Sequence, residues 1–156
     1  MTLFQIATLL AALGSAIIGG LFFAFSAFIM RALAARPAGE GMAAMVSINR
    51  VILRSLFMPV FLGTALLSGL AGGWAVTHWG PGACTVSAGA LLYLAGSLCV
   101  TMIWNVPLNN LIDRADPAAD NAALWGLYVR RWARWNHVRT LASLGAAVAF
   151  MLPFVR

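Results

Sequence analysis

A polar segment beside an apolar run carries the clearest chemical signal in the chain. Residues Trp132 to Thr140 read Trp-Ala-Arg-Trp-Asn-His-Val-Arg-Thr, and an apolar run begins at Leu141. In a helix the spacing i, i+3, i+4 and i+7 places four polar residues in one stripe: Asn136, Arg139, Thr140 and Ser143. A charged side chain at the bilayer centre costs about 2.5 to 3.5 kcal/mol or more. The stripe should therefore face protein partners or a water-filled cavity.

Amide side chains form a second set of candidate groups. The segment 104–110 reads Trp-Asn-Val-Pro-Leu-Asn-Asn, and Asn105 and Asn109 share a helix face because they are four residues apart. Pro107 removes one backbone donor and should loosen the helix near them. Asn49 lies just before the second apolar run. A solvated or capping role is the alternative interpretation for Asn49.

These groups together predict a site for proton removal and charge stabilisation. His137 is the predicted general base, because histidine ordinarily exchanges protons near neutral pH. Arg139 and Asn109 are predicted to stabilise a developing oxyanion at low dielectric. The predicted substrate-binding residues, suited to a flat and partly apolar molecule with oxygen substituents, are Asn49, Asn105, Trp104, Trp132, Trp135, Asn136 and Thr140. Two alternatives stay open: His137 as an interfacial residue, and Arg139 as an anchor to lipid phosphates.

The sequence argues against several other kinds of site. The two histidines are predicted on opposite membrane faces, and Cys84 and Cys99 lie too far apart on one predicted helix to bridge. No Ser-His-Asp set and no glycine-rich phosphate loop is recognised. We therefore expect no metal and no cofactor, with a single haem on His137 as the remaining alternative.

Composition indicates an integral membrane protein. Of 156 residues, 62% are hydrophobic and 9% are charged, whereas about a quarter of the residues of a soluble domain are charged. The net charge of +6 comes from arginines that cluster beside apolar runs, which the positive-inside rule explains without invoking nucleic acid. The expected macromolecular environment is the lipid bilayer, with the chain forming one domain over residues 1–156.

The apolar runs predict an all-α fold, a four-helix bundle in the membrane. The expected spans are about 3–30, 56–77, 84–106 and 137–153. Arginines concentrate in the connectors 31–55 and 107–136, so both connectors are predicted to be cytoplasmic and both termini to lie outside. This describes a multi-pass protein of the cell (inner) membrane. Small residues such as Gly63, Gly69 and Gly96 permit helix pairing within one chain or in a homo-oligomer.

At residues 105–110 and 132–140 the chain resembles the anthrone oxygenase-like family of small four-helix membrane proteins. The resemblance extends over essentially the whole chain. The matching positions are Asn105, Pro107, Asn109, Trp132, Asn136, Arg139 and Thr140, whereas His137 occupies a more variable position.

The resemblance implies an oxidoreductase that uses O2, without a cofactor, to oxidise an anthrone-like aromatic or polyketide substrate to a quinone. Tryptophans would then form the walls of the site, and Asn136 could hold a water as an alternative base. A different class of function stays open: a small membrane subunit or carrier that binds a quinone, haem or lipid without turning it over.

Overall fold

The computed structural model describes residues 1–155, and most of them are helical. The α-helices in chain order are α1 (Leu3–Ala24), α2 (Met30–Ala34), α3 (Ala38–Ile52), α4 (Phe57–Thr77), α5 (Ala83–Leu91), α6 (Val106–Asp113) and α7 (Ala122–Met151). Short π-helical segments join α1 to α2 (Phe25–Ile29) and α5 to α6 (Leu92–Cys99 and Thr101–Asn105). A 3-10 turn, Leu152–Phe154, follows α7.

Four helical rods are long and apolar enough to cross a membrane. They are Leu3–Ala34, Phe57–Thr77, Ala83–Asp113 and Ala122–Phe154, and each exceeds the roughly 20 residues that a span requires. The α1 rod contacts α4 and α7, and the α5 rod contacts the same two helices, so the four close into a bundle. The predicted all-α membrane bundle is confirmed, and the protein is a multi-pass membrane protein. Which membrane it occupies and on which side its termini lie remain predictions.

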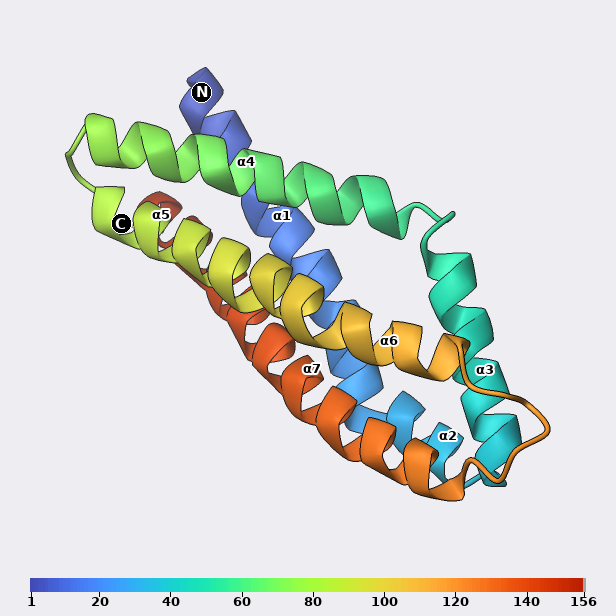
Figure 1. Cartoon of the computed structure of the whole chain (residues 1–156). Coiled ribbons are helices and arrows are strands. Elements are labelled where there is room, and N and C mark those ends of the chain that lie inside the picture. Colours follow the sequence, from blue (N-terminus) through green and yellow to red (C-terminus); the bar gives the residue numbers. More distant parts are fainter. Residues whose placement is uncertain (156) are drawn as a thin grey trace.

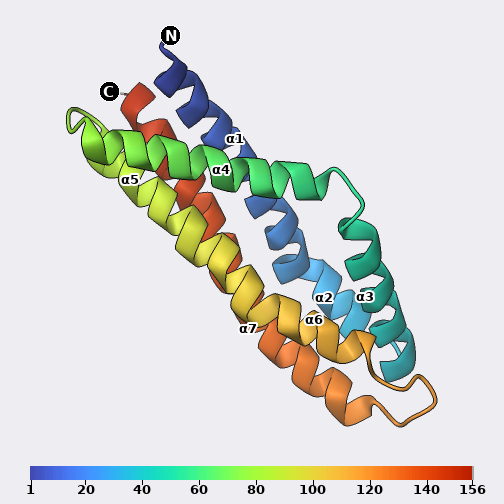
Figure 2. The ribbon, with the colours of Figure 1, turned by 45° about the horizontal axis from the view of Figure 1, so that its top comes forward.

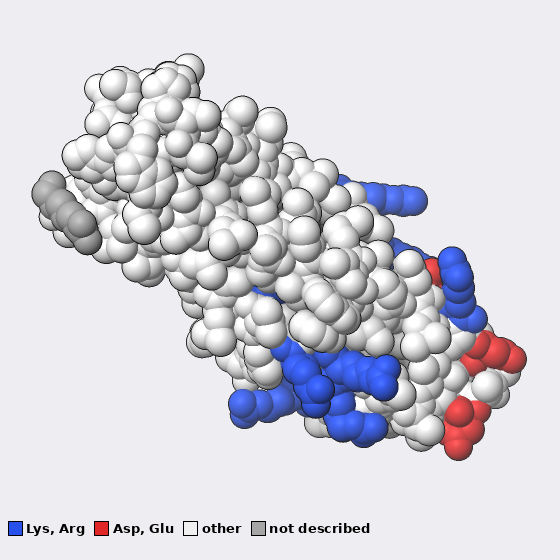
Figure 3. All heavy atoms as spheres, turned by 60° about the vertical axis from the view of Figure 1, so that its left-hand side comes forward, with Lys and Arg blue, Asp and Glu red and all other residues white. Residues whose placement is uncertain are grey.

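The two ends of the bundle differ in what they hold. Figures 1 and 2 show both termini and the α4–α5 loop at one end, and α2, α3 and the α6–α7 loop at the other. We call these the terminal end and the arginine-rich end. Figure 3 shows arginine, aspartate and glutamate gathered toward the latter and a long uncharged surface toward the former. The uncharged surface is suited to lipid.

Local sequence signals account for where the helices begin and bend. Thr2 caps α1 in a capping box: Gln5 N donates to Thr2 Oγ1 at 3.3 Å, and Thr2 N donates to Gln5 Oε1 at 2.9 Å. Gly82 precedes α5 with φ of 83°, in the left-handed region that favours glycine. A π-helical segment ends directly before Val106 and Pro107, where the missing backbone donor predicts a loosened helix.

Two core clusters hold the bundle together. The cluster in the terminal half combines alanines with a few large side chains, chiefly Ile18, Phe61, Tyr93 and Phe150. The cluster in the arginine-rich half is built from larger side chains: Phe25, Met30, Met42, Met45, Ile112, Trp125, Tyr128 and Trp132. The second cluster surrounds the residues that the sequence singled out, and α3 covers it by contributing its two methionines.

Candidate functional site

Arg139 lies inside the bundle with only 5% of its surface exposed. Its Nη1 donates to Thr101 Oγ1 at 3.2 Å, and its Nη2 donates to Asn136 Oδ1 at 2.7 Å. The guanidinium carbon is 4.1 Å from the Phe22 ring centroid and 5.2 Å from that of Trp132. Within residues 1–155 no carboxylate lies within ion-pair distance of it. Two aromatic faces and two oxygen acceptors therefore take the place of a counter-ion.

Asn136 connects this buried charge to α1. Its Nδ2 donates to the Phe22 carbonyl and to Ser26 Oγ, both at 2.8 Å. Ser26 also lies 3.1 Å from Thr140 Oγ1, and Thr140 donates to the Asn136 carbonyl at 2.8 Å. Ser26 belongs to the π-helical segment Phe25–Ile29, a type of segment that often marks functional sites.

His137 stands at the outer end of the same network. Its side chain is exposed, and its Nδ1 lies 2.9 Å from Ser26 Oγ. A continuous run of hydrogen-bonded groups thus joins Arg139, Asn136, Ser26 and His137; we call it the arginine–histidine relay. The relay brings together three residues that the sequence singled out, and it links an exposed imidazole to a buried cation.

His137 lines a groove of about 190 Å³ on the surface between α7 and the α1–α2 rod. The remaining lining residues, mostly apolar with one arginine, are Phe25, Ser26, Met30, Arg31, Ala34, Val129 and Ala133. Pockets for drug-sized ligands usually measure about 300–1,000 Å³. This groove, which we call the histidine groove, would hold a small molecule or the reactive part of a larger one.

The predicted amides on the α5–α6 rod contact α7 rather than the groove. Asn109 Oδ1 accepts from Tyr128 OH and from Trp132 Nε1, each at 2.9 Å. Asn105 is 1% exposed and its Nδ2 donates to the Trp132 carbonyl at 3.3 Å. Both amides therefore hold the start of α7 against α6, with Trp132 packed between them and Arg139.

Several buried polar atoms in this region have no hydrogen-bond partner. They include Arg139 Nε, Asn105 Oδ1 and Asn49 Nδ2, the last on the half-buried Asn49 of α3. An unpaired buried polar atom costs about 1 to 3 kcal/mol. Three more unpaired atoms, the hydroxyl oxygens of Ser15, Ser68 and Ser87, lie in the terminal half, so unpaired polar atoms occur at both ends of the bundle. Most buried polar groups in proteins are paired, so each of these atoms is open to a further partner such as a water molecule.

The tryptophan pair predicted as a pocket wall lies elsewhere. Trp104 and Trp135 stack on each other with ring centroids 4.0 Å apart. Trp135 and His137 are two positions apart on α7, which at 3.6 residues per turn places them roughly 200° apart around the axis. The structure therefore does not bring this pair to the histidine groove.

Ser26 and Phe22 are central contacts of the relay that sequence reasoning missed. Ser26 is the one hydroxyl among the phenylalanines at the end of the first span, and that contrast was the available signal. Phe22 contributes a ring face and a backbone carbonyl, which no side-chain pattern reveals. Thr101, a further acceptor of Arg139, also lies in a π-helical segment.

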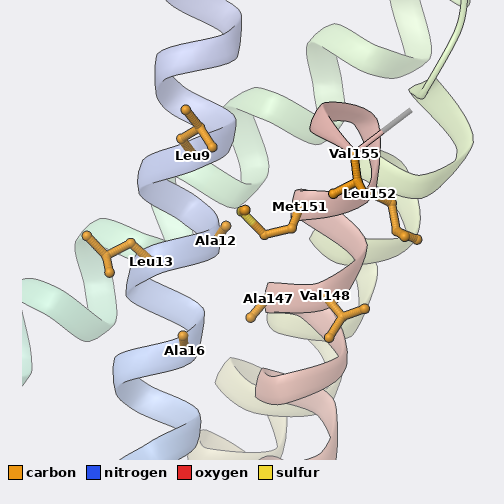
Figure 4. A pocket seen from close by; sticks show the side chains of 9 residues that line it. All are labelled: Leu9, Ala12, Leu13, Ala16, Ala147, Val148, Met151, Leu152 and Val155. Atoms are coloured by element: carbon orange, nitrogen blue, oxygen red, sulfur yellow. The ribbon is translucent and has the colours of Figure 1, made fainter.

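A second groove lies nearer the termini. It encloses about 580 Å³ and is lined only by aliphatic or methionine side chains, among them Ala12 and Met151, which face one another across it (Figure 4). Val148 of this groove and His137 are eleven positions apart, close to three helical turns, so both grooves lie along the same side of α7. The larger groove offers no group for chemistry.

The described part of the chain, residues 1–155, contains no cluster of three or more His, Cys, Asp or Glu side chains placed to hold a metal ion. Cys84 and Cys99 are both exposed and unpaired.

Comparison with known proteins identifies the family. No curated protein and no solved structure matches this chain. The sequence model described as anthrone oxygenase matches residues 49–149 of the 156, a range that holds Asn49, Asn105, Asn109 and all of the relay except Ser26. The match covers well over half of the sequence, so the chain belongs to the anthrone oxygenase family.

Proposed function

We propose that this protein is a membrane oxygenase that oxidises an anthrone-like aromatic methylene to a quinone carbonyl with O2 and without a cofactor. The main support for this proposal is the exposed imidazole of His137 in a largely apolar groove, linked through Ser26 and Asn136 to a buried arginine. Membership of the anthrone oxygenase family supports the reaction class. The substrate would be a flat molecule that reaches the groove from the bilayer.

The chemistry needs a base and an anion-stabilising environment. A base removes one methylene proton, and the resulting carbanion is delocalised into the flanking rings and the ring carbonyl. The carbanion passes one electron to O2, and the carbon radical and superoxide combine to form a C–O bond. The peroxide takes the proton back from the base. Loss of the second C–H proton breaks the O–O bond and releases water, so methylene plus O2 yields carbonyl plus H2O.

His137 is the group that would touch the substrate and carry the proton. It is the one imidazole among the residues that line the groove, and imidazole is the side chain most often used as a general base. Phe25, Met30, Val129 and Ala133 would contact the ring faces. Arg31 also lines the groove and would favour an anionic substituent or intermediate.

Arg139 would act from behind the groove. It touches Asn136 and Thr101, so its positive charge would favour the substrate anion through a region of low dielectric, where such effects are strong. Asn105, Asn109 and Trp132 would position α7. Direct contact of Arg139 or Asn109 with a reacting oxygen stays a prediction.

The test is O2 uptake by the purified protein with anthrone, corrected for autoxidation. His137→Gln should lower kcat by about 100-fold or more, the size expected for loss of a general base. His78→Gln is the matched control, because His78 is also exposed but lies at the end of α4, near the opposite end of the bundle. No uptake above the uncatalysed rate, or equal activity of His137→Gln, would refute the proposal. Stoichiometric haem absorbance would refute its cofactor-free form.

A carrier of apolar-tailed molecules is the second candidate. The all-apolar groove of about 580 Å³, on the same side of α7 as the histidine groove, favours it. A carrier would bind a tailed quinone, and that binding would survive His137→Gln without any O2 uptake. An oxygenase would show uptake that depends on His137.

A further inference from the structure

We infer that the hydrogen bonds around Asn136 set the proton position on the surface histidine: the relay holds His137 in the form protonated on Nδ1 and leaves Nε2 free as the accepting nitrogen. Ser26, Thr140 and Asn136 are positioning residues in this scheme. The assignment of the proton follows from hydrogen-bond geometry alone. Its meaning for catalysis rests on the proposed function.

The first step fixes the orientation of the Asn136 amide. Arg139 can only donate, so the Asn136 atom 2.7 Å from its Nη2 must be the amide oxygen. The Phe22 carbonyl can only accept, so the atom 2.8 Å from it must be the amide nitrogen. Two independent partners thus agree on one orientation. A flipped amide would place two donors together at Arg139 and two acceptors together at Phe22.

The second step fixes the hydroxyl protons. The Asn136 nitrogen donates its second proton to Ser26 Oγ. Thr140 donates its single hydroxyl proton to the backbone carbonyl of Asn136, so Thr140 Oγ1 can only accept at the 3.1 Å contact with Ser26. The Ser26 proton must therefore point to Thr140.

The third step fixes the imidazole. With its own proton directed to Thr140, Ser26 can only accept at the 2.9 Å contact with His137 Nδ1. Neutral imidazole carries one proton, so Nδ1 holds it and Nε2 keeps its lone pair. All the contacts are satisfied only in this arrangement. Any other arrangement leaves two oxygens, or an oxygen and a nitrogen, facing each other without a proton.

The consequence for the reaction is a base with a defined accepting atom. Histidine side chains free in water favour the proton on Nε2, so the relay would reverse the ordinary preference. Arg139 and the Phe22 carbonyl together begin the chain of constraints, and neither has a hydrogen bond to His137.

The experiment is 15N and 13C NMR of histidine-labelled protein in alkaline buffer, where imidazoles are ordinarily neutral. Only two histidines are present, so His78 serves as an internal reference. Wild-type His137 should be predominantly protonated on Nδ1. Thr140→Val, which removes a hydroxyl that does not contact His137, should free the Ser26 proton and move the imidazole population toward Nε2–H. Thr140→Ser should restore the wild-type population.

A matched control is Thr77→Val, because Thr77 Oγ1 lies 3.0 Å from His78 Nδ1. This change should alter the His78 signals and leave those of His137 unchanged. Ser26→Ala gives a second route if Thr140→Val does not fold, and it should also shift His137 toward Nε2–H. A wild-type His137 protonated mainly on Nε2, or an Nδ1–H form that persists in both variants, would overturn the inference.

Turnover supplies the link to function. Thr140→Val should lower kcat about tenfold with little change in KM, since orientation of one hydrogen bond is lost and binding contacts remain. Thr140→Ser should recover it. If the NMR result holds but no variant or wild type consumes O2, the proton assignment stands and the oxygenase proposal fails. If uptake is normal while wild-type His137 is protonated mainly on Nε2, the inference fails alone.

Discussion

The two halves of α7 meet their neighbours in different ways. From Trp125 to Thr140 the helix presents large aromatic and polar side chains to the bundle. From Ala142 to Phe150 it presents mainly alanines and one phenylalanine to glycines of the opposite rod. A Cβ added at Gly96 would lie 2.5 Å from Ala142 Cβ, and one at Gly89 would lie 3.0 Å from the Phe150 ring. We call these the polar half and the packed half of α7.

The difference separates two uses of burial. In the packed half close approach of small residues supplies van der Waals contact, which drives helix association inside a bilayer. In the polar half a cation is buried without a carboxylate, and Trp125 Nε1 and Arg139 Nε are unpaired. Buried unmatched charge costs several kcal/mol. The packed half therefore stabilises the bundle, while the polar half, to which the proposed chemistry belongs, buries its charge at a cost to stability.

The largest expected effect on stability is in the packed half. Phe150 is 0% exposed, so Phe150→Ala should lower the free energy of unfolding by about 3–5 kcal/mol, the usual cost of removing a core phenylalanine. Denaturation in detergent micelles measures this change. The remaining folded protein should keep the wild-type kcat. A loss of kcat at full stability would show that the packed half also serves the site.

Arg139→Met should have the opposite pattern to Phe150→Ala, with activity lost and stability retained. The change removes an unpaired buried charge, whose desolvation costs several kcal/mol, and leaves Asn136 Oδ1 without its donor, which costs about 1–3 kcal/mol. We expect the free energy of unfolding to stay level or rise while O2 uptake falls about 10- to 100-fold. Parallel denaturation and uptake assays test this. A clear loss of stability would mean that Arg139 is a structural element.

Tyr93→Phe tests the separation of the two halves with a smaller expected change in the free energy of unfolding. Tyr93 is 0% exposed in the core of the terminal half, and its hydroxyl donates to the Phe61 carbonyl at 3.1 Å. Its removal should cost about 1 kcal/mol, the typical net value of one hydrogen bond, and should not alter kcat. Thermal unfolding of wild type and variant in the same detergent gives the value. A change in kcat would contradict the separation of the two halves.

The smallest effect is expected at the surface of the arginine-rich end. Arg50 on α3 and Asp113 on α6 form an ion pair of 2.8 Å, but both side chains are largely exposed. Exposed pairs contribute roughly 0–1 kcal/mol, so Arg50→Gln should change the unfolding free energy by less than about 1 kcal/mol. The difference should shrink further in high salt, where such charges are screened. A larger loss would indicate that α3 is held by this pair rather than by its methionines.

The sequence by itself determined the class of protein and the number of its spans. The run Thr2–Met30 lacks any charge and is longer than the roughly 20 residues that a membrane-spanning helix requires. Four apolar runs of spanning length predict a bundle of membrane helices. The spacing of Asn136, Arg139 and Thr140 placed them on one face, and the structure buries all three. Helix periodicity and the cost of charge in lipid are local properties, so they can be read along one segment.

Only the tertiary structure decided which of the candidate residues meet. The contacts of Ser26 with Asn136 and His137 join positions more than one hundred residues apart, and no local pattern specifies such pairs. Packing also placed Trp104 and Trp135 away from His137, and engaged the Asn109 oxygen with Tyr128 and Trp132. The relay depends on how α1 and α7 pack around a π-helical turn, and that geometry arises from long-range contacts rather than from the order of residues in either helix.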